Sequence, residues 1–475
     1  MKVGQDDPLT VAEGVQDDRV PDYWEQRLPE QIRRTPDTML FGHSFLSRRF
    51  RAGDRAPANR VAQPVPERMF GLDEECPDGG RCAHSAQDSC FATQAYRLTI
   101  AGNHRATAVR LAECALADEA CKYHLNCVWS ALITEICADD LVRADEHCAR
   151  LATESYWADC PPAKKMLSLL RARICSVAGD SRGALAHCQE VLAGGAPDSL
   201  KATAVAWLVQ TLVIVGRTGQ ALDVLAEQGF AGPVPPGIPG RADLLAARGA
   251  VAVAVGRPLD GIAEYSACGA ELDRVNITNP AVVPWRPQAA LAAISVRQNE
   301  TAKNLAQTEL ARARRWGAPS AVGRALYVVA AIDGGRRADS WADEAISLLE
   351  LAHAWVELPC ALTIHGTILR DRNDLGGSRK QLNRAIAIAR ECGNSYWEAQ
   401  ARAALELVVE PQKLSRQEVE VLKLATVGYR NTEIAKRLSL ARRTVEFHLS
   451  SIYRKLGVSS RRELPSSAEM CLWFS

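Results

Sequence analysis

Several short motifs that mark enzymes are missing from this sequence. The dipeptide Gly-Lys occurs nowhere in its 475 residues, which excludes a phosphate-binding loop of the form GxxxxGK[ST]. The zinc-protease motif HExxH and the glycine-rich dinucleotide-binding fingerprint are absent as well. The amino-terminal part also lacks the alternating strand and helix pattern of a phosphoacceptor receiver domain. We therefore expect neither an enzyme nor a bound cofactor.

Long apolar runs are missing too. No stretch of about 18 uninterrupted apolar residues exists, which is the length that a membrane-spanning helix needs. The opening MKVGQDDPLTVAEGVQDD carries acidic side chains where an export signal needs an apolar core. The sequence therefore predicts a cytoplasmic protein with no membrane partner.

Cysteine is abundant, yet the CxxC spacing of many metal and redox sites is missing. Eleven of the 15 cysteines lie before residue 190, at irregular intervals. In a reducing compartment, buried thiols are the simplest interpretation. One tight group is a weak candidate for a metal or redox site, and it comprises Cys76, Cys82, His84 and Cys90. Its spacing does not match common zinc motifs, so loop cysteines without a metal are the favoured interpretation.

Composition divides the chain into three parts: residues 1–90, 91–409 and 410–475. The first part holds 8 of the 23 prolines and is predicted to be largely irregular or disordered, with a short helix near Asp22 to Arg34. Its basic run Arg48-Arg49-Phe50-Arg51 is interpreted as a solvated tail, with nonspecific DNA contact as the alternative.

The second part is rich in Ala and Leu and is interrupted at a regular interval. The interruptions fall at Gly102, Asp139, Gly179, Gly216, Gly256, Gln298, Gly335 and Asn373. Intervals of 37 to 42 residues indicate an internal repeat. The units at Gly179 and Gly216 resemble tetratricopeptide (TPR) units, in which glycine turns the chain between two helices. Their period exceeds the usual TPR length of about 34 residues, so we predict a TPR-like helical-repeat solenoid.

A helix pair of this kind cannot bury its apolar side alone. Neighbouring pairs must stack into a curved array, and the concave side of such an array offers an extended binding surface. We expect a domain for sensing, protein interaction or dimerisation. A passive spacer is an equally consistent interpretation, because a fold does not fix a function.

The sequence of the third part, residues 410–475, predicts three short helices. Ser415 and Glu418 form a capping box that starts a helix at about residue 416, and this helix ends before Gly428. Asn431 is the predicted N-cap of a second helix, which a tight turn at 439–441 ends. A third helix then runs from about 442 to 456. Its predicted buried stripe comprises Val445, Leu449, Ile452 and Leu456.

Positive charge is concentrated in this last part. Residues 413–463 contain 12 Lys and Arg against 5 Asp and Glu, a net charge of +7. The whole chain carries +1, which leaves −6 for the remainder. A local basic helical unit is the electrostatic pattern of a protein that binds a phosphate backbone.

The residues here resemble the LuxR-type (GerE-like) helix-turn-helix of bacterial transcription factors. The strings LSRQEVEVL, GYRNTEIAKRL, RRTVEFHL and YRKLGV fall in that family's order and spacing. The resemblance implies an all-α chain that ends in a four-helix DNA-binding domain, whose third helix enters the major groove. The residues that it implies for DNA binding are Lys436, Arg442, Arg443, Thr444, Glu446, Phe447, Ser450, Ser451, Arg454, Lys455 and Arg461.

Chemistry suggests different roles within that set. Arginine suits guanine or phosphate, and Phe447 suits a thymine methyl group. Glu446 either accepts from a cytosine amino group or points away from phosphate. Thr444, Ser451, Lys455 and Arg461 are assigned to backbone oxygens.

Three residues depart from the family pattern. One of them is Glu446, which occupies a groove-facing position where a cation is common. Ala441 stands where the family usually has a serine that caps the third helix, which weakens that cap by about 1 kcal/mol. Pro465 falls within the expected fourth helix, which often helps the family to dimerise. Dimerisation is therefore assigned to the amino-terminal part.

Repeats followed by this domain resemble the back half of the large ATP-binding LuxR regulators. The sequence predicts a nucleoid-associated, homodimeric transcriptional regulator, with activation as the commoner outcome in the family. RNA polymerase and a protein or small-molecule effector are further candidate partners. The alternative is a TPR-like scaffold or adaptor protein whose helix-turn-helix serves protein interaction. A metal or redox sensor within the first 190 residues is a third possibility, and it is compatible with the regulator.

Overall fold

The computed structural model describes residues 90–335, 337–408, 414–456, 461 and 464. The predictions for the first 89 residues lie outside this range, as does the one for Pro465. They include the short helix, the basic run and three of the four residues of the weak metal candidate, namely Cys76, Cys82 and His84.

The described part is helical, and no strand occurs in it. Its first eight helices are α3 (Phe91–Ala101), α4 (Arg105–Ala117), α5 (Leu125–Cys137), α6 (Leu141–Thr153), α7 (Ser155–Asp159), α8 (Pro161–Val177), α9 (Ser181–Leu192) and α10 (Asp198–Ile214). The next six are α11 (Thr218–Glu227), α12 (Arg241–Ala254), α13 (Pro258–Arg274), α14 (Trp285–Ser295), α15 (Asn299–Trp316) and α16 (Pro319–Asp333). The array ends with α17 (Ala338–Leu351), α18 (Leu358–Asp371), α19 (Leu375–Glu391) and α20 (Ser395–Glu406). The carboxy-terminal unit comprises α21 (Arg416–Thr426), α22 (Asn431–Arg437) and α23 (Arg442–Leu456).

The predicted interruptions are the turns between the two helices of each pair. Six of the eight predicted residues have positive φ, namely Gly102, Asp139, Gly179, Gly216, Gly256 and Asn373. In the other two turns the left-handed residue lies one position earlier, at Arg297 and Gly334. A left-handed residue after a helix lets the next amide donate back to the carbonyl five residues earlier. At Gly179, for example, the Asp180 N–H donates to the Cys175 carbonyl at 2.8 Å.

Small residues hold the two helices of a pair together. Ala184 and Ala221 are fully buried at the equivalent positions of two repeats. In the next pair Gly261 takes this place, and a Cβ atom there would lie 2.6 Å from Val253 Cγ2 and 3.0 Å from the Gly249 carbonyl oxygen. Helices α12 and α13 therefore approach too closely for a side chain at this position.

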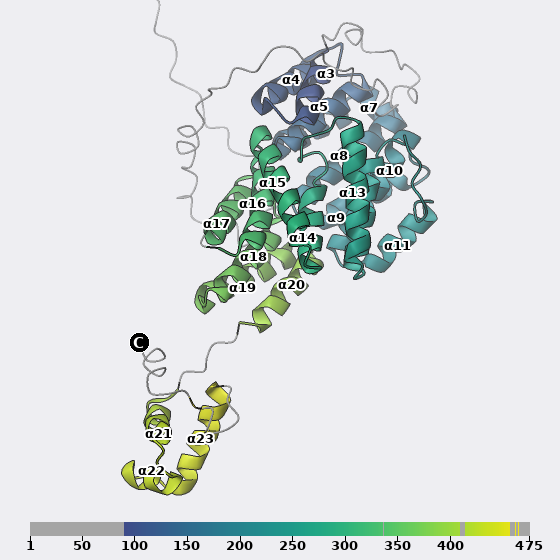
Figure 1. The fold of residues 1–475 in the computed structure, drawn as a ribbon. Coiled ribbons are helices and arrows are strands. Elements are labelled where there is room, and N and C mark those ends of the chain that lie inside the picture. Colours follow the sequence, from purple (N-terminus) through teal and green to yellow (C-terminus); the bar gives the residue numbers. More distant parts are fainter. Residues whose placement is uncertain (1–89, 336, 409–413, 457–460, 462–463, 465–475) are drawn as a thin grey trace, which may run out of the picture.

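The array winds so tightly that later pairs contact earlier ones (Figure 1). The Asn279 amide donates to the Thr99 carbonyl at 2.7 Å, and the Trp316 indole donates to the Cys137 carbonyl at 2.7 Å. Asp139 accepts bonds from the Ser320 backbone and hydroxyl at 2.7 and 2.6 Å. These partners are 179 to 181 residues apart, which is between four and five repeat intervals.

This winding leaves little of helices α5 and α10 exposed. Eleven of the 13 residues of α5 and twelve of the 17 residues of α10 are buried. Between these helices Trp129 stacks on Trp207, with ring centroids 6.3 Å apart. The Trp207 indole donates to Asp243 at 3.1 Å. The inward faces of α5 and α10 are thus covered by other parts of the array.

The carboxy-terminal helices have a hydrophobic core of their own. Its buried members are Val421, Leu422, Ala425, Ile434, Ala435, Val445, Leu449 and Ile452. None of the helices in the described part combines the length and the apolar character needed to cross a membrane.

Candidate DNA-binding site

Helix α21 begins as predicted. The Ser415 N–H donates to the Glu418 carboxylate at 2.6 Å, and the Glu418 N–H donates to the Ser415 hydroxyl at 3.2 Å. This reciprocal pair is a capping box, and it satisfies two amides that would otherwise lack an intrahelical partner. The helix ends at Thr426, and Gly428 follows with a φ of 99°.

The start of α22 differs from the prediction. The N-cap is Arg430, whose N–H donates to the Glu433 carboxylate at 2.7 Å, and Asn431 is the first helical residue. The Asn431 side chain instead accepts a bond from Arg461 at 3.3 Å. The Asn431 side chain thus holds Arg461, which follows α23 in the sequence, against the start of α22.

A tight turn separates α22 from α23. Ser439 has a φ of 54°, and the Leu440 N–H donates to the Ala435 carbonyl at 2.9 Å. Helix α23 then starts directly after Ala441, whose carbonyl accepts from the Thr444 N–H at 2.9 Å. Ala441 has no side-chain oxygen to cap the helix, as the sequence indicated.

One side of α23 is buried against the other two helices. Val445 and Ile452 are fully buried, and Leu449 is 4% exposed. The described members of the predicted stripe therefore hold the helix in place. The side chains of Arg454, Lys455 and Leu456 lie outside the described part.

The opposite side of α23 faces solvent. Arg442, Arg443, Phe447 and Ser450 are exposed there, and Phe447 is 72% exposed. Thr444, Glu446 and Ser451 are half-buried, and Lys436 on α22 is exposed. Arg443, Phe447 and Ser450 follow one another at intervals of four and three residues, so they share one face of the helix. We call these three residues the outer row.

Two exposed cations at the start of α23 differ in their surroundings. The Arg442 guanidinium lies 2.9 Å from the Glu446 carboxylate one turn later, which partly neutralises both groups. Within the described part, no hydrogen bond or ion pair joins the Arg443 side chain to another residue. Its guanidinium is therefore the more available of the two for an anionic or base-edge partner.

Arg461 lies in a different place from the other candidates. Its guanidinium donates to the Ala425 carbonyl at 3.2 and 2.9 Å, to Asn431 at 3.3 Å and to the Tyr429 carbonyl. These acceptors surround the turn between α21 and α22. Sequence reasoning missed this role, because the segment after α23 carries no periodic pattern that shows where it folds back.

One serine resembles a catalytic motif but has a structural role. Gly179-Asp180-Ser181-Arg182-Gly183 matches the GxSxG string of serine hydrolases, which requires a strand before the serine. Here helix α8 precedes it, and Ser181 is the buried first residue of α9. The Ser181 hydroxyl donates to the Cys392 carbonyl at 2.7 Å. The serine therefore joins two turns of the array.

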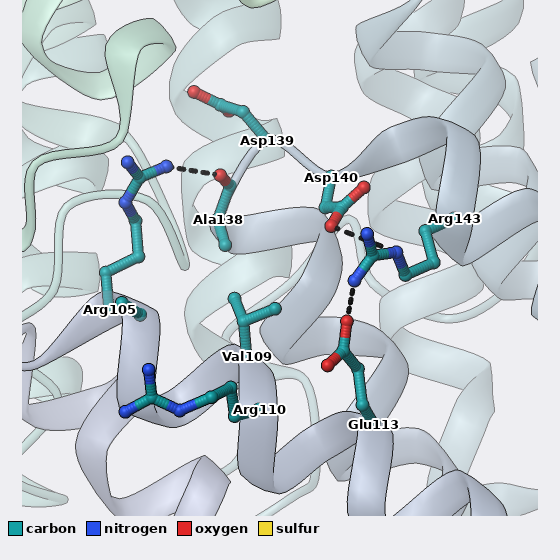
Figure 2. Close-up of a pocket in the computed structure, with 9 residues that line it drawn as sticks. Arg105, Val109, Arg110, Glu113, Ala138, Asp139, Asp140 and Arg143 are labelled. Carbon is teal, nitrogen blue, oxygen red and sulfur yellow. Dashed lines mark hydrogen bonds and ion pairs between the residues drawn. The ribbon is translucent and has the colours of Figure 1, made fainter. Parts of the chain in front are cut away.

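The array also has an open hollow between α4 and α6 (Figure 2). Its charged lining residues are Arg105, Arg110, Arg143, Glu113, Asp139 and Asp140. Arg143 pairs with Glu113 and lies 3.5 Å from Asp140, and Arg105 donates to the Ala138 carbonyl at 2.9 Å. Three cations face three anions, so the hollow offers no excess charge for a nucleic acid.

Comparison with known proteins identifies a family for the carboxy-terminal unit. Residues 412–468 match the family described as bacterial regulatory proteins, luxR family. Sixty-five residues are 35% identical to the HTH-type transcriptional regulator MalT of Yersinia pestis, and the same identity is found for MalT of Yersinia pseudotuberculosis and of Serratia proteamaculans. The match covers 14% of this chain and only 7% of the length of these relatives. The carboxy-terminal unit is therefore a helix-turn-helix domain of the luxR family, joined here to a long helical-repeat array.

Proposed function

We propose that this protein is a sequence-specific DNA-binding transcriptional regulator. The observation that carries the proposal is the outer row on α23, where polar, cationic and aromatic side chains stand exposed on a helix that is firmly packed on its other side. The luxR-family match of the same segment supports it. In this account α23 lies in the major groove, which is wide enough to admit one α-helix.

The outer row supplies the chemistry for reading bases. Arg443 can donate two parallel hydrogen bonds to guanine, and the exposed ring of Phe447 can contact a thymine methyl group. Phe447 is 72% exposed, and exposing so much apolar surface to water is unfavourable in the free protein, so a partner that covers this residue gains affinity. The Ser450 hydroxyl already donates to the Glu446 carbonyl at 3.0 Å, and its oxygen can still accept.

Phosphate contacts are assigned to the residues around this row. Lys436 and Arg442 are exposed on neighbouring helices, and Thr444 and Ser451 are half-buried beside them. Lys455 keeps its predicted contact with backbone oxygens, and Arg454 keeps its predicted contact with a base or the adjacent backbone. Such contacts fix the position of the helix on the duplex without reading its sequence. Glu446 has a separate role, because its pairing with Arg442 at 2.9 Å orients that cation.

The array is assigned to regulation. We propose that it joins two copies of the chain and receives a protein or small-molecule signal, and that the bound dimer activates transcription by engaging RNA polymerase. These roles are proposed for the whole chain, whereas its similarity to the relatives is limited to the carboxy-terminal domain. The uncapped start of α23 favours one rival function, a scaffold whose helix-turn-helix binds protein.

A matched pair of variants tests DNA binding directly. Arg443→Ala removes an exposed cation from the outer row. Arg402→Ala removes an exposed cation from α20 in the array, where it pairs with Glu398 at 2.9 Å. In the full-length protein, Arg443→Ala should weaken binding to a selected duplex by about 1 to 3 kcal/mol, or roughly 5- to 150-fold in Kd. Arg402→Ala should change it less than about twofold. Equal effects of the two variants would exclude the docking of α23 and favour the scaffold.

A further inference from the structure

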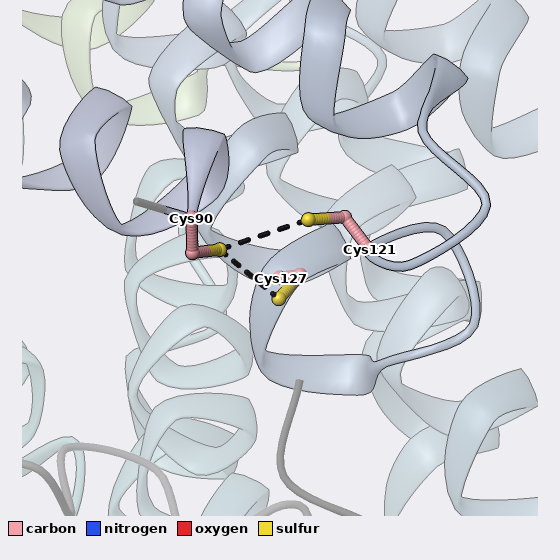
Figure 3. A group of neighbouring side chains, drawn as sticks. All are labelled: Cys90, Cys121 and Cys127. Carbon is pink, nitrogen blue, oxygen red and sulfur yellow. Dashed lines mark hydrogen bonds between the residues drawn. The ribbon is translucent and has the colours of Figure 1, made fainter. Parts of the chain in front are cut away.

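Three buried cysteines meet at the amino-terminal end of the array (Figure 3). The Cys90 Sγ atom lies 3.7 Å from Cys121 Sγ and 3.7 Å from Cys127 Sγ. All three sulfur atoms lie within 4.8 Å of one another, and the side chains are 1%, 0% and 7% exposed. Separations of 3.7 Å are far longer than a disulfide bond of about 2.05 Å, so the group consists of thiols.

The repeat itself brings these residues together. Cys90 and Cys127 are 37 residues apart, which is one repeat interval. Cys90 immediately precedes α3 and Cys127 lies in the first turn of α5, so they occupy similar places at the starts of two adjacent helices. Cys121 reaches them from the turn between α4 and α5.

The spacing suits a shared metal ion. A zinc ion binds thiolate sulfur at about 2.3 Å, and two sulfur atoms on a tetrahedral ion are then about 3.8 Å apart. The two sulfur separations at Cys90 therefore already have the length that shared coordination requires. The sulfur atoms of Cys121 and Cys127 lie within 4.8 Å of each other, which exceeds the distance for shared coordination by at most about 1 Å.

Two of the three thiols lie at helix starts. The starts of helices α3 and α5 place partial positive charge near Cys90 and Cys127, which favours the thiolate form that binds metal.

We propose that Cys90, Cys121 and Cys127 bind one thiophilic metal ion, with zinc as the preferred class. Binding releases the thiol protons to solvent and leaves three thiolates on the ion. A divalent ion then leaves a net charge of −1, which the two helix starts offset, whereas a monovalent ion leaves −2. The bound ion joins α3, the turn before α5 and α5 itself, and thereby fixes the first two helix pairs of the array.

A second group with metal-ligating side chains is less suited to this role. His365 lies 2.9 Å from Asp339 and 3.4 Å from Asp343. Asp343 is exposed, and Asp339 also pairs with Arg372 at 3.5 Å. His365 Nε2 and Arg372 both contact the Asp339 carboxylate, so this carboxylate is already engaged without a metal.

The test uses the reduced full-length protein after treatment with a chelator. Titration with Co(II) should give the intense near-ultraviolet band of thiolate coordination at one ion per chain, and Zn(II) should displace it. Cys121→Ser should weaken binding at least tenfold and lower the thiolate band. Cys188→Ser, which removes a buried thiol elsewhere in the array, should leave both unchanged.

Two further measurements test the proposal even if the Cys121→Ser variant folds poorly. In the unchanged protein, Zn(II) should slow amide hydrogen exchange in peptides from residues 90–137 and not in those from α18 and α19. Cys82→Ser should retain full binding. The proposal is wrong if no ion binds, if Cys82→Ser abolishes binding, or if mass spectrometry of the unreduced protein shows a disulfide between Cys90 and either neighbour in place of a metal.

Discussion

Replacing Arg461 by alanine separates a structural role from a DNA contact. The family resemblance assigns this residue to the DNA backbone, whereas its guanidinium donates to Ala425, Tyr429 and Asn431 within the domain. If the internal bonds are its main role, the variant loses stability in the first two helices. If a phosphate contact is its main role, the variant loses DNA affinity in a salt-dependent way.

The expected loss of stability follows from these bonds. A hydrogen bond to a charged group contributes about 1.5 to 3 kcal/mol. Arg461 is half-buried, so water can replace part of what the carbonyls lose. We therefore expect the variant to open α21 and α22 more easily by about 2 kcal/mol, which makes their amides exchange about 30-fold faster.

Hydrogen exchange and DNA titration on the same full-length samples decide between the roles. Arg461→Ala should speed exchange in peptides from residues 416–437 and leave the slope of log Kd against log salt unchanged. Arg443→Ala, the matched control, should leave exchange unchanged and weaken binding. Normal exchange in Arg461→Ala together with a slope reduced by about one would refute the structural role.

Three further substitutions test the account of stability. Ala441→Ser restores a cap at the start of α23 and should stabilise the carboxy-terminal unit by about 1 kcal/mol in denaturant unfolding; a loss of stability would contradict that geometry. Gly261→Ala should destabilise the array by about 1 to 2 kcal/mol because its Cβ meets Val253 at 2.6 Å, whereas Gly219→Ala, with nothing within 4 Å, should be neutral or stabilising. Burial raises the pKa of Glu309 to about 7 from an ordinary value of 4.5. Because the folded pKa is the higher one, stability should fall by up to about 3 kcal/mol as the pH rises from 4.5 to above 7, and Glu309→Gln should flatten this dependence.

Local features of the fold were predictable because they depend on neighbouring residues. Glycine and asparagine readily adopt positive φ, so the helix-ending turns at Gly179 and Asn373 were located to the residue. At Arg297 a bulky side chain adopts the left-handed conformation, and the interruption was predicted one residue late at Gln298. The capping box at Ser415 was predictable for the same local reason.

Long-range features were not predictable in the same way. The repeat period shows that neighbouring pairs stack, but not how steeply the array winds, so the bond between Asp139 and Ser320 gave no sequence signal. The internal role of Arg461 and the resulting use of Asn431 depend on how the chain folds back after α23. The proximity of Cys90 and Cys127 could have been predicted, because the two residues are one repeat interval apart in the sequence.

Selection of the full-length protein against a random duplex library, at two salt concentrations, tests the central claim most directly. The account predicts enrichment of one base sequence, arranged as two inverted half-sites, with affinity that falls as salt rises. Loss of that enrichment in Arg443→Ala would tie the specificity to α23. Binding without any enriched sequence, abolished by moderate salt, would contradict sequence-specific regulation and favour the scaffold.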